Sequence, residues 1–484
     1  MSEDKSKKVD RRGFLKKVAV GGVVAAAAAG GLGYYLSQPS APPVTPTTTT
    51  SAAGPTKIDF FIWQYGVQMV QDNVGRYNAA HPESNIVLSS VPQETYGDDV
   101  IARFSSNVPT DLLYSDVNYQ ILFEPAGWIA PTEDYFPEIT RYKDDFSKGY
   151  LPGFLNKDGK MYGLSYYGDY TCYLFNDRIL SQAGISAPAK TWDEVITHAQ
   201  QIQQKVPGVK FPLAAFFGSY GFWQTFYNFM QGIGGPDAKF FDNDLNPTFN
   251  TPGGPVFKTI RWLVDAITKF KVMTPDTVNY DDPTCANTMG AGTHAYMWEP
   301  RYDFIGTNTA PQKEAGHIKQ ALNPGSGYAS CWARPYNMTT YNVKRGKDAM
   351  QAQWNFQEYF GGKSDDKLNP DFSNGTYRVA KRIAIDLAVG FVYDSLWDDP
   401  EVINAYNSFG DINIMKAQAQ KIILHQTDGL TKYWTKWSGG FVQGPARTAI
   451  TALMLGQKPT TDDDIMKVLD DLAKQWNDLK ASSG

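Results

Sequence analysis

The chain has 484 residues and is poor in cysteine, with only Cys172, Cys285 and Cys331. None of them belongs to a closely spaced pair, which zinc and iron–sulfur sites need, so we expect neither a metal nor another cofactor. A bridge between Cys285 and Cys331 stays open for an exported chain and would leave Cys172 buried in a strand. The five histidines are scattered along the chain, which favours structural over catalytic roles.

Positive charge is scarce beyond the N-terminus. The 45 Lys and Arg are outnumbered by 50 Asp and Glu, so the net charge is −5. This balance argues against a nucleic-acid partner. Aromatic residues are abundant instead, at 14% of the chain, with 28 Tyr and 12 Trp. So many rings are compatible with carbohydrate-binding faces, although core packing would use most of them.

The N-terminus carries a pattern typical of export. The sequence Arg11-Arg12-Gly13-Phe14-Leu15-Lys16 resembles a twin-arginine signal and precedes an uncharged run over residues 18–36. That run is also long enough to anchor the chain in a bilayer. We therefore expect a signal or anchor over 1–38, with cleavage left open, and an extended Pro/Thr-rich stalk over 39–56.

The length of the chain exceeds the size at which one hydrophobic core stops growing, so two lobes are expected. Strands and helices alternate after the stalk, with strands over 57–63, 85–91 and 111–114 and helices over 67–81 and 96–105. This alternation predicts a parallel sheet with right-handed crossovers. Ligands bind beyond the carboxyl ends of the strands in such sheets, where Trp63, Tyr65 and Asp116 lie.

Residues 158–195 combine several local signals. They predict a strand over 160–165, a polar aromatic segment over 166–169, a strand over 170–175 and a helix over 177–183. Gly184 is suited to end that helix, and Thr191 caps the next one, with Glu194 completing a capping box. Two strands separated by a polar aromatic segment favour a chain that crosses between two lobes beside a ligand cleft.

The ordered motifs of this stretch resemble those of extracellular solute-binding proteins of ABC sugar-uptake systems, the family that includes the maltodextrin-binding proteins. The matching motifs are Tyr162-Gly163, Phe175-Asn176-Asp177, Ala183-Gly184 and Thr191-Trp192-Asp193-Glu194, whereas Ser165 stands where the family has Pro. The resemblance extends over most of the chain after Lys57 and is loose between residues 366 and 413. The apolar segment and stalk resemble archaeal binding proteins that are tethered to the outer face of the membrane.

This resemblance implies a two-lobed α/β fold of the periplasmic-binding-protein-like type II class. Each lobe would be a mainly parallel sheet flanked by helices, with the cleft between the lobes. Lobe 1 would comprise residues 57–166 and 332–396, and lobe 2 would comprise residues 167–331 and 397–484.

The residue types and the resemblance together nominate a sugar site. Aromatic rings suit the C–H faces of a sugar, and carboxylates, amides and arginines suit its hydroxyls. Asp169 is the first candidate, because it lies in the crossing at the position of a sugar-binding carboxylate in the maltodextrin-binding proteins. The stacking candidates are Trp63, Trp298, Tyr220 and Trp223, and the other ligand-binding candidates are Asp116, Tyr65, Tyr167, Glu299, Arg334 and Gln443. The alternatives are a solvated hinge acid for Asp169, a helix cap for Asp116, a core position for each tryptophan and an ion pair for Arg301.

These features predict the extracellular substrate-binding component of an ABC transporter. We expect a monomer without enzymatic activity that captures a mono- or oligosaccharide between its lobes and delivers it to a membrane permease. A secreted glycoside hydrolase stays open as an alternative, and it would need a carboxylate pair about 5–9 Å apart, such as Asp169 and Glu299. A second alternative keeps the fold but binds a peptide, an amino acid or an anion.

Overall fold

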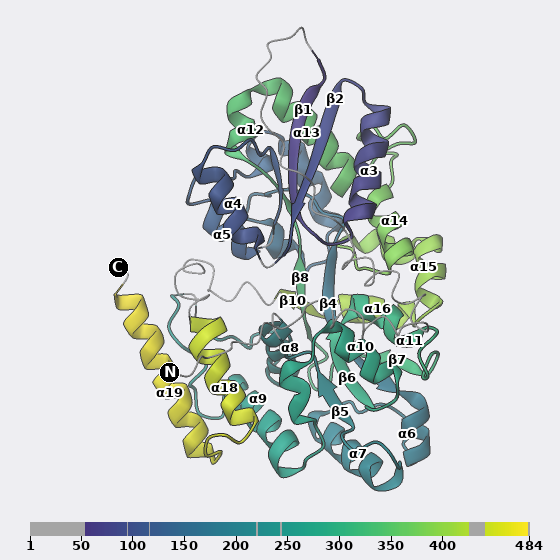
Figure 1. Ribbon diagram of the computed structural model, residues 1–484, viewed down its shortest axis with the longest axis vertical. Coiled ribbons are helices and arrows are strands. Elements are labelled where there is room, and N and C mark those ends of the chain that lie inside the picture. Colours follow the sequence, from purple (N-terminus) through teal and green to yellow (C-terminus); the bar gives the residue numbers. More distant parts are fainter. Residues whose placement is uncertain are drawn as a thin grey trace, which may run out of the picture.

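The computed structural model describes residues 54–93, 95–115, 117–218, 221–242, 244–424 and 441–482. They form two lobes, one above the other in Figure 1, and each lobe is built on its own sheet. The expected signal or anchor and most of the stalk lie outside the described residues. Among the helices that are described, none is long and apolar enough to cross a membrane.

Lobe 1, the upper part of Figure 1, contains a four-stranded sheet in the order β2-β1-β3-β9. The strands are β1 (Thr56–Trp63), β2 (Ser84–Val91), β3 (Leu112–Tyr114) and β9 (Tyr336–Met338). Strand β1 pairs in parallel with β2 and β3, and β9 pairs antiparallel with β3. The end of β1 is buried from Phe60 to Trp63, as is usual for a parallel strand covered on both faces.

The first three helices of lobe 1 alternate with its strands as expected, and the other three follow β9 in succession. They are α3 (Val67–Ala80), α4 (Tyr96–Ser105), α5 (Val117–Phe123), α12 (Thr340–Arg345), α13 (Lys347–Gly361) and α14 (Arg378–Leu387). Helix α13 packs against β1, and α3 packs against β2. The prediction of a strand–helix alternation with a parallel sheet is therefore confirmed for this lobe.

Lobe 2 contains a six-stranded sheet in the order β10-β8-β4-β6-β5, with β7 also paired to β4. The strands are β4 (Gly168–Asn176), β5 (Leu213–Ala215), β6 (Tyr296–Pro300), β7 (Ile318–Ala321), β8 (Ala329–Ala333) and β10 (Ile422–Leu424). Strand β4 runs antiparallel to β6, β7 and β8. The sheet is thus mixed rather than mainly parallel, because the chain enters lobe 2 along β4 and leaves it along the neighbouring β8.

The helices of lobe 2 surround this sheet. They are α6 (Asp177–Ala183), α7 (Trp192–Lys205), α8 (Gly221–Gly234), α9 (Pro255–Val264), α10 (Asp282–Gly290), α11 (Phe304–Asn308), α18 (Arg447–Met454) and α19 (Asp462–Ala481). Two further helices, α15 (Pro400–Asn407) and α16 (Ile412–Ala419), lie between α14 and β10 in the chain. Helix α15 packs against α14 of lobe 1, and α16 packs against β7 of lobe 2. The lobe boundaries expected from the sequence stay a prediction.

The stretch 158–195 folds largely as its local signals predict. Asn176 accepts the Ile179 N–H at the start of α6, and Gly184 ends this helix in the left-handed region. Trp192 packs in the core of lobe 2 against the ring of Trp298. The expected strand over 160–165 does not form, since Met161 makes only an isolated bridge with Leu155.

The three cysteines are buried thiols outside any disulfide. Cys172 lies in β4, Cys285 in α10 and Cys331 in β8. The structure therefore contains no bridge between Cys285 and Cys331.

The capping box of α7 makes a testable contribution to stability. Thr191 Oγ1 accepts the Glu194 N–H at 3.2 Å, and the Glu194 carboxylate accepts the Thr191 N–H at 3.1 Å. We expect Thr191→Ala to lower the free energy of unfolding by about 1 kcal/mol, measured by chemical denaturation. Thr197→Ala, within the same helix, should cause little loss because alanine favours helix interiors. Equal losses in the two variants would contradict a capping role.

Candidate ligand-binding site at the lobe junction

Two extended segments carry the chain between the lobes, and they lie side by side. The first leads from Tyr166 into β4, and the second leaves β8 through Arg334 into β9. Gly168 pairs with Ala333 in an antiparallel ladder. The segment over 166–169 therefore leads from lobe 1 into the start of β4, where a hinge strand is expected.

Four aromatic residues meet beside these crossings, and we call them the junction aromatic cluster: Tyr65, Tyr167, Tyr302 and Trp332. Tyr65 follows β1 in lobe 1, and Tyr302 lies in a short 3-10 turn (Arg301–Asp303) after β6 in lobe 2. The ring centroid of Tyr65 lies 5.8 Å from that of Tyr167 and 6.1 Å from that of Tyr302. Tyr302 also contacts Trp332. The two lobes thus touch through aromatic rings.

Burial divides this cluster into an inner and an outer pair. Tyr167 and Trp332 are buried, and the Trp332 indole N–H donates to the Tyr167 hydroxyl at 3.0 Å. Tyr65 and Tyr302 are half-buried. The outer pair therefore supplies one partly accessible ring from each lobe, supported by a buried pair that is fixed by a hydrogen bond.

Arg334 adds a positive charge to the same region. Its guanidinium carbon lies 5.5 Å from the centroid of the Trp63 ring, and its side chain is half-buried. Trp63 is itself buried against Tyr96 and Tyr114. Burial raises the pKa of Tyr167 well above its usual value, although the nearby Arg334 charge opposes that rise. We use the name junction site for the junction aromatic cluster together with Trp63 and Arg334.

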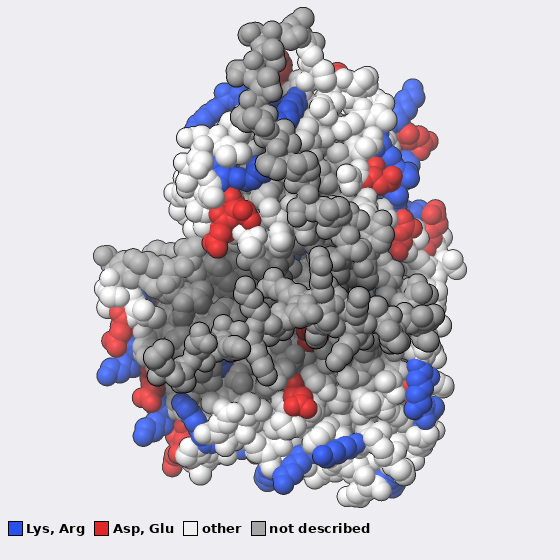
Figure 2. Space-filling view, in the orientation of Figure 1, with Lys and Arg blue, Asp and Glu red and all other residues white. Residues whose placement is uncertain are grey.

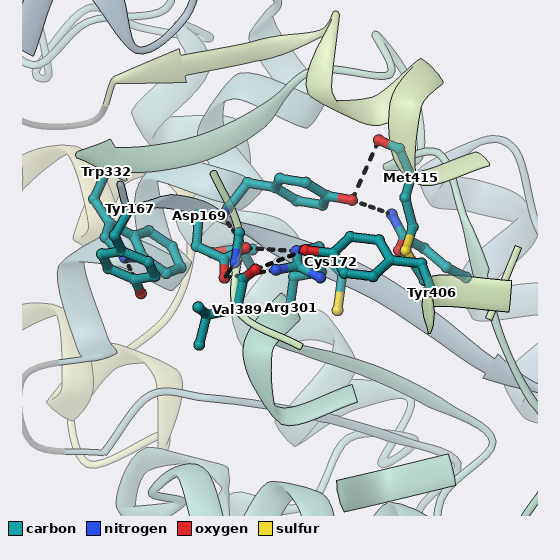
Figure 3. A network of polar contacts seen from close by, with 12 residues as sticks. Tyr167, Asp169, Cys172, Arg301, Trp332, Val389, Tyr406 and Met415 are labelled. Atoms are coloured by element: carbon teal, nitrogen blue, oxygen red, sulfur yellow. Dashed lines mark hydrogen bonds and ion pairs between the residues drawn. The ribbon is translucent and has the colours of Figure 1, made fainter. Parts of the chain in front are cut away.

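Asp169, the first ligand-binding candidate, is fully buried, and its role toward a ligand stays a prediction. Its two oxygens accept hydrogen bonds from Arg301 Nε at 2.7 Å and Arg301 Nη2 at 3.0 Å. The backbone N–H groups of Tyr170 and Gly390 donate to the same carboxylate at 3.0 and 2.9 Å. Figure 3 shows this network. Protein donors thus surround the carboxylate, and Arg301 is its ion-pair partner.

The charge state of Arg301 follows from this pairing. Burial acts to lower the pKa of its guanidinium, but the neighbouring Asp169 carboxylate raises that pKa above its usual value. Arg301 therefore stays protonated inside the protein.

Trp298 and Trp223 are buried in the core of lobe 2, which is the core position left open for each of them. Trp298 is fully buried between Tyr173 and Trp192, and its indole N–H donates to Asn323 Oδ1 at 3.1 Å. The Trp223 indole N–H donates to the Val442 carbonyl at 2.9 Å. Strand β6 has neighbours on both sides in the sheet, and its residues are buried throughout.

Glu299, on the same strand, is fully buried too and does not face a ligand. Its Oε1 accepts the hydroxyl of Thr307 at 2.8 Å. Burial raises the pKa of this carboxyl to about 8. Glu299 is therefore largely protonated at neutral pH.

The remaining candidates do not join the junction site in the described structure. Gln443 is exposed in the turn Val442–Ala446, next to the carbonyl that accepts the Trp223 indole N–H. Asp116 and Tyr220 lie outside the described residues. Of the residues nominated from the sequence, the structure brings together Trp63, Tyr65, Tyr167 and Arg334.

Tyr302 and Trp332 were missed by sequence reasoning. Tyr302 directly follows the strand end Pro300-Arg301, a position from which side chains commonly reach a ligand. Trp332 precedes Arg334 by two residues at the start of the expected return crossing. Each position carried a usable signal, but neither residue was singled out.

Other features of the described residues do not compete with the junction site. Two cavities of about 560 Å³ and about 370 Å³ lie on lobe 2, and Lys190 lines both. No group of His, Cys, Asp and Glu among the described residues is arranged to hold a metal ion. On the face shown in Figure 2, the described charged side chains of both signs are interspersed around the rims of the lobes.

Comparisons with known proteins place this geometry in context. A probable amino-acid ABC transporter periplasmic-binding protein, y4oP of Sinorhizobium fredii, is 25% identical over 242 residues, which cover 48% of this chain. The match spans 52% of that relative, about half its length. Maltose-bound MalE3 of T. maritima superposes with a TM-score of 0.67 at 16% identity, over 88% of this chain and 100% of that one.

A second solved structure is similar to this chain as well. The sugar-binding protein MalE of Xanthomonas citri has a TM-score of 0.71 at 15% identity, over 88% of this chain and 98% of its own. These two structures show that the fold is the two-lobed α/β fold expected from the sequence. The family model described as bacterial extracellular solute-binding protein matches residues 64–336. Since this match covers more than half of the sequence, the chain belongs to the family of bacterial extracellular solute-binding proteins.

Proposed function

We propose that this protein is the substrate-binding component of an ABC transporter and that it captures a sugar at the junction site. One observation carries the proposal: Tyr65 of lobe 1 and Tyr302 of lobe 2 meet as half-buried rings beside the two crossings. Aromatic rings suit the C–H faces of a sugar, and the Arg334 guanidinium suits its hydroxyls. The maltose-bound and sugar-binding relatives support the same ligand class.

Ligand capture follows from the placement of the two rings. A molecule that contacts both Tyr65 and Tyr302 gains its full set of contacts only when the lobes are close. It therefore stabilises the closed arrangement by the difference between its affinities for the closed and open forms. We propose that the closed, monomeric protein then delivers its sugar to a membrane permease.

We further propose how the protein is held outside the cell. Residues 1–38 would direct export through a twin-arginine signal and then anchor the chain or be cleaved, and residues 39–56 would form the stalk. The support for this is the sequence pattern and the extracellular character of the family.

An amino acid is the second candidate ligand. The relative y4oP is described as a probable amino-acid ABC transporter periplasmic-binding protein, and Arg334 could pair with the carboxylate of an amino acid. The two ligand classes place different demands on the site. A sugar relies on the faces of Tyr65 and Tyr302, whereas an amino acid relies more on the charge of Arg334.

The hydrolase alternative loses its proposed carboxylate pair. Asp169 is paired with Arg301, and Glu299 is fully buried beside Thr307. A general acid and a nucleophile must both reach the glycosidic bond, which these two residues do not do. We therefore infer a binding role rather than hydrolysis.

Removal of either ring should weaken sugar binding. We expect Tyr65→Ala and Tyr302→Ala each to raise the Kd roughly tenfold or more, about 1.4 kcal/mol, because each loses one aromatic face. Calorimetric titration with maltose, ribitol, single amino acids and short peptides would measure this. Tyr135→Ala, which removes an exposed tyrosine of lobe 1, is the control.

Each other outcome of this titration is informative. Sugar binding that neither ring variant changes would place the sugar elsewhere. Binding of amino acids alone would favour the second ligand class. Release of reducing sugar from oligosaccharides would contradict a pure binding role.

The buried acid Glu299 predicts a loss of stability as the pH rises. Its pKa is about 8 in the folded protein, against an ordinary value of 4.5, so between these values the folded chain keeps a proton that the unfolded chain releases. The free energy of unfolding should fall across this window, by up to about 1.4 kcal/mol per pH unit. The Glu299→Gln variant has no carboxyl proton to release, so its free energy of unfolding should fall less steeply as the pH rises.

Urea denaturation at pH 5, 6, 7 and 8 would compare the two proteins. Glu138→Gln, which changes an exposed glutamate of lobe 1, should keep the wild-type slope. A wild-type slope in Glu299→Gln as well would show that Glu299 is not the group that holds the proton.

A further inference from the structure

We propose that Arg301 is a positioning residue that, through Asp169, sets the orientation of the two lobes and thereby the spacing of Tyr65 and Tyr302. That this spacing matters for ligand binding rests on the proposed function. The role of Arg301 in the orientation of the lobes does not depend on that function. Arg301 would act without touching a ligand.

The first observation is the bidentate geometry of the ion pair. Arg301 and Asp169 are both 0% exposed, and two nitrogens of the guanidinium bind the two carboxylate oxygens. The pair therefore joins the end of β6 to the start of β4, the neighbouring strand of the lobe 2 sheet, at the point where the chain enters that lobe. A bidentate contact of this kind fixes direction as well as distance.

The second observation is a third segment held by the same carboxylate. The Gly390 N–H donates to Asp169 Oδ2 at 2.9 Å, which brings residues 388–392 against the crossing. A side chain at position 390 would not fit, because its Cβ would lie 2.1 Å from the Gly168 carbonyl oxygen and 2.9 Å from Asp169 Cγ. The two backbones are thus in direct contact and must move together.

Tyr406 of α15 closes the arrangement from the other side, as Figure 3 shows. The Arg301 guanidinium carbon lies 5.1 Å from the centroid of the Tyr406 ring. The hydroxyl of Tyr406 donates to the Val389 carbonyl at 2.6 Å. Arg301, Asp169, Gly390 and Tyr406 therefore form one buried unit, which we call the hinge node.

The hinge node is connected to the junction site through the chain itself. Tyr302 directly follows Arg301, its ring meets Tyr65 of lobe 1, and its hydroxyl donates to Asp282 Oδ2 at 3.0 Å. Asp169 lies opposite Trp332 in the ladder between the crossings. Under the proposal, a change in the Arg301 contacts is passed to Tyr302 through the adjoining backbone.

Tyr406→Phe is a conservative substitution that tests the proposal, because it removes one hydroxyl and keeps the ring beside Arg301. Tyr359→Phe is the matched control, since it removes another buried hydroxyl, which donates to the Asn73 carbonyl at 3.2 Å inside lobe 1. Spin labels would be attached at Glu138→Cys in lobe 1 and Asp463→Cys in lobe 2. The native cysteines are buried and so are protected from the label.

The measurement is the interlobe distance distribution of the unliganded full chain by pulsed electron paramagnetic resonance. We expect Tyr406→Phe to shift or broaden the distribution and Tyr359→Phe to leave it unchanged. Arg301→Lys, which keeps the charge but loses the bidentate contact, should broaden it further if it folds. An unchanged distribution in Tyr406→Phe, or equal broadening in both tyrosine variants, would overturn the proposal.

A maltose titration of the same variants separates this proposal from the proposed function. We expect Tyr406→Phe to weaken maltose binding about fivefold, as for the loss of one buried hydrogen bond. If maltose binds neither the wild type nor any variant, the proposed sugar ligand is wrong. The distance distributions would still decide whether the hinge node sets the lobe orientation. If maltose binds all variants equally despite a shifted distribution, the link between orientation and affinity is refuted.

Discussion

A charge pair sealed from water is the constraint around which the lobe junction is built. Removing a carboxylate and a guanidinium from water is costly unless the remaining lone pairs and N–H groups find partners. Asp169 meets this condition with two nitrogens of Arg301 and two backbone N–H groups. The need of this buried carboxylate for hydrogen-bond donors explains why Gly390 approaches so closely and why an arginine lies at the end of β6. The local backbone is arranged to satisfy one carboxylate.

Local signals in the sequence were enough to predict much of the fold. Short motifs correctly predicted the capping box of Thr191 and Glu194 and the end of helix α6 at Gly184, because both depend only on neighbours within a few residues. The parallel sheet of lobe 1 followed from the alternation of strands and helices. The mixed sheet of lobe 2 was not predicted, because it depends on β8 returning beside β4, and this pairing joins segments about 160 residues apart.

The site was harder to predict for the same reason. The sequence placed Asp169 in the crossing, but its partner Arg301 lies 132 residues further along the chain, so this ion pair could not be predicted. Trp298 has the residue type of a stacking platform, and only the three-dimensional packing reveals that Tyr173 and Trp192 cover it. The positions of Tyr65 and Arg334 at the lobe junction could be predicted because strand ends and crossings can be recognised locally. The family resemblance predicted where the candidate residues lie in the fold better than it predicted which groups they contact.

The return of the chain through β9 has a consequence for biosynthesis. The sheet of lobe 1 is completed only when Tyr336–Met338 pairs with β3, more than 200 residues after β3 itself. During synthesis β3 therefore has a free edge until the lobe 2 strands β4 to β8 have been made, and such edges invite pairing with other chains. A ribosome-bound chain at this stage is exposed to aggregation. Completion of the fold inside the cell, before passage across the membrane, would close that edge, and this is the order of events that a twin-arginine signal would impose.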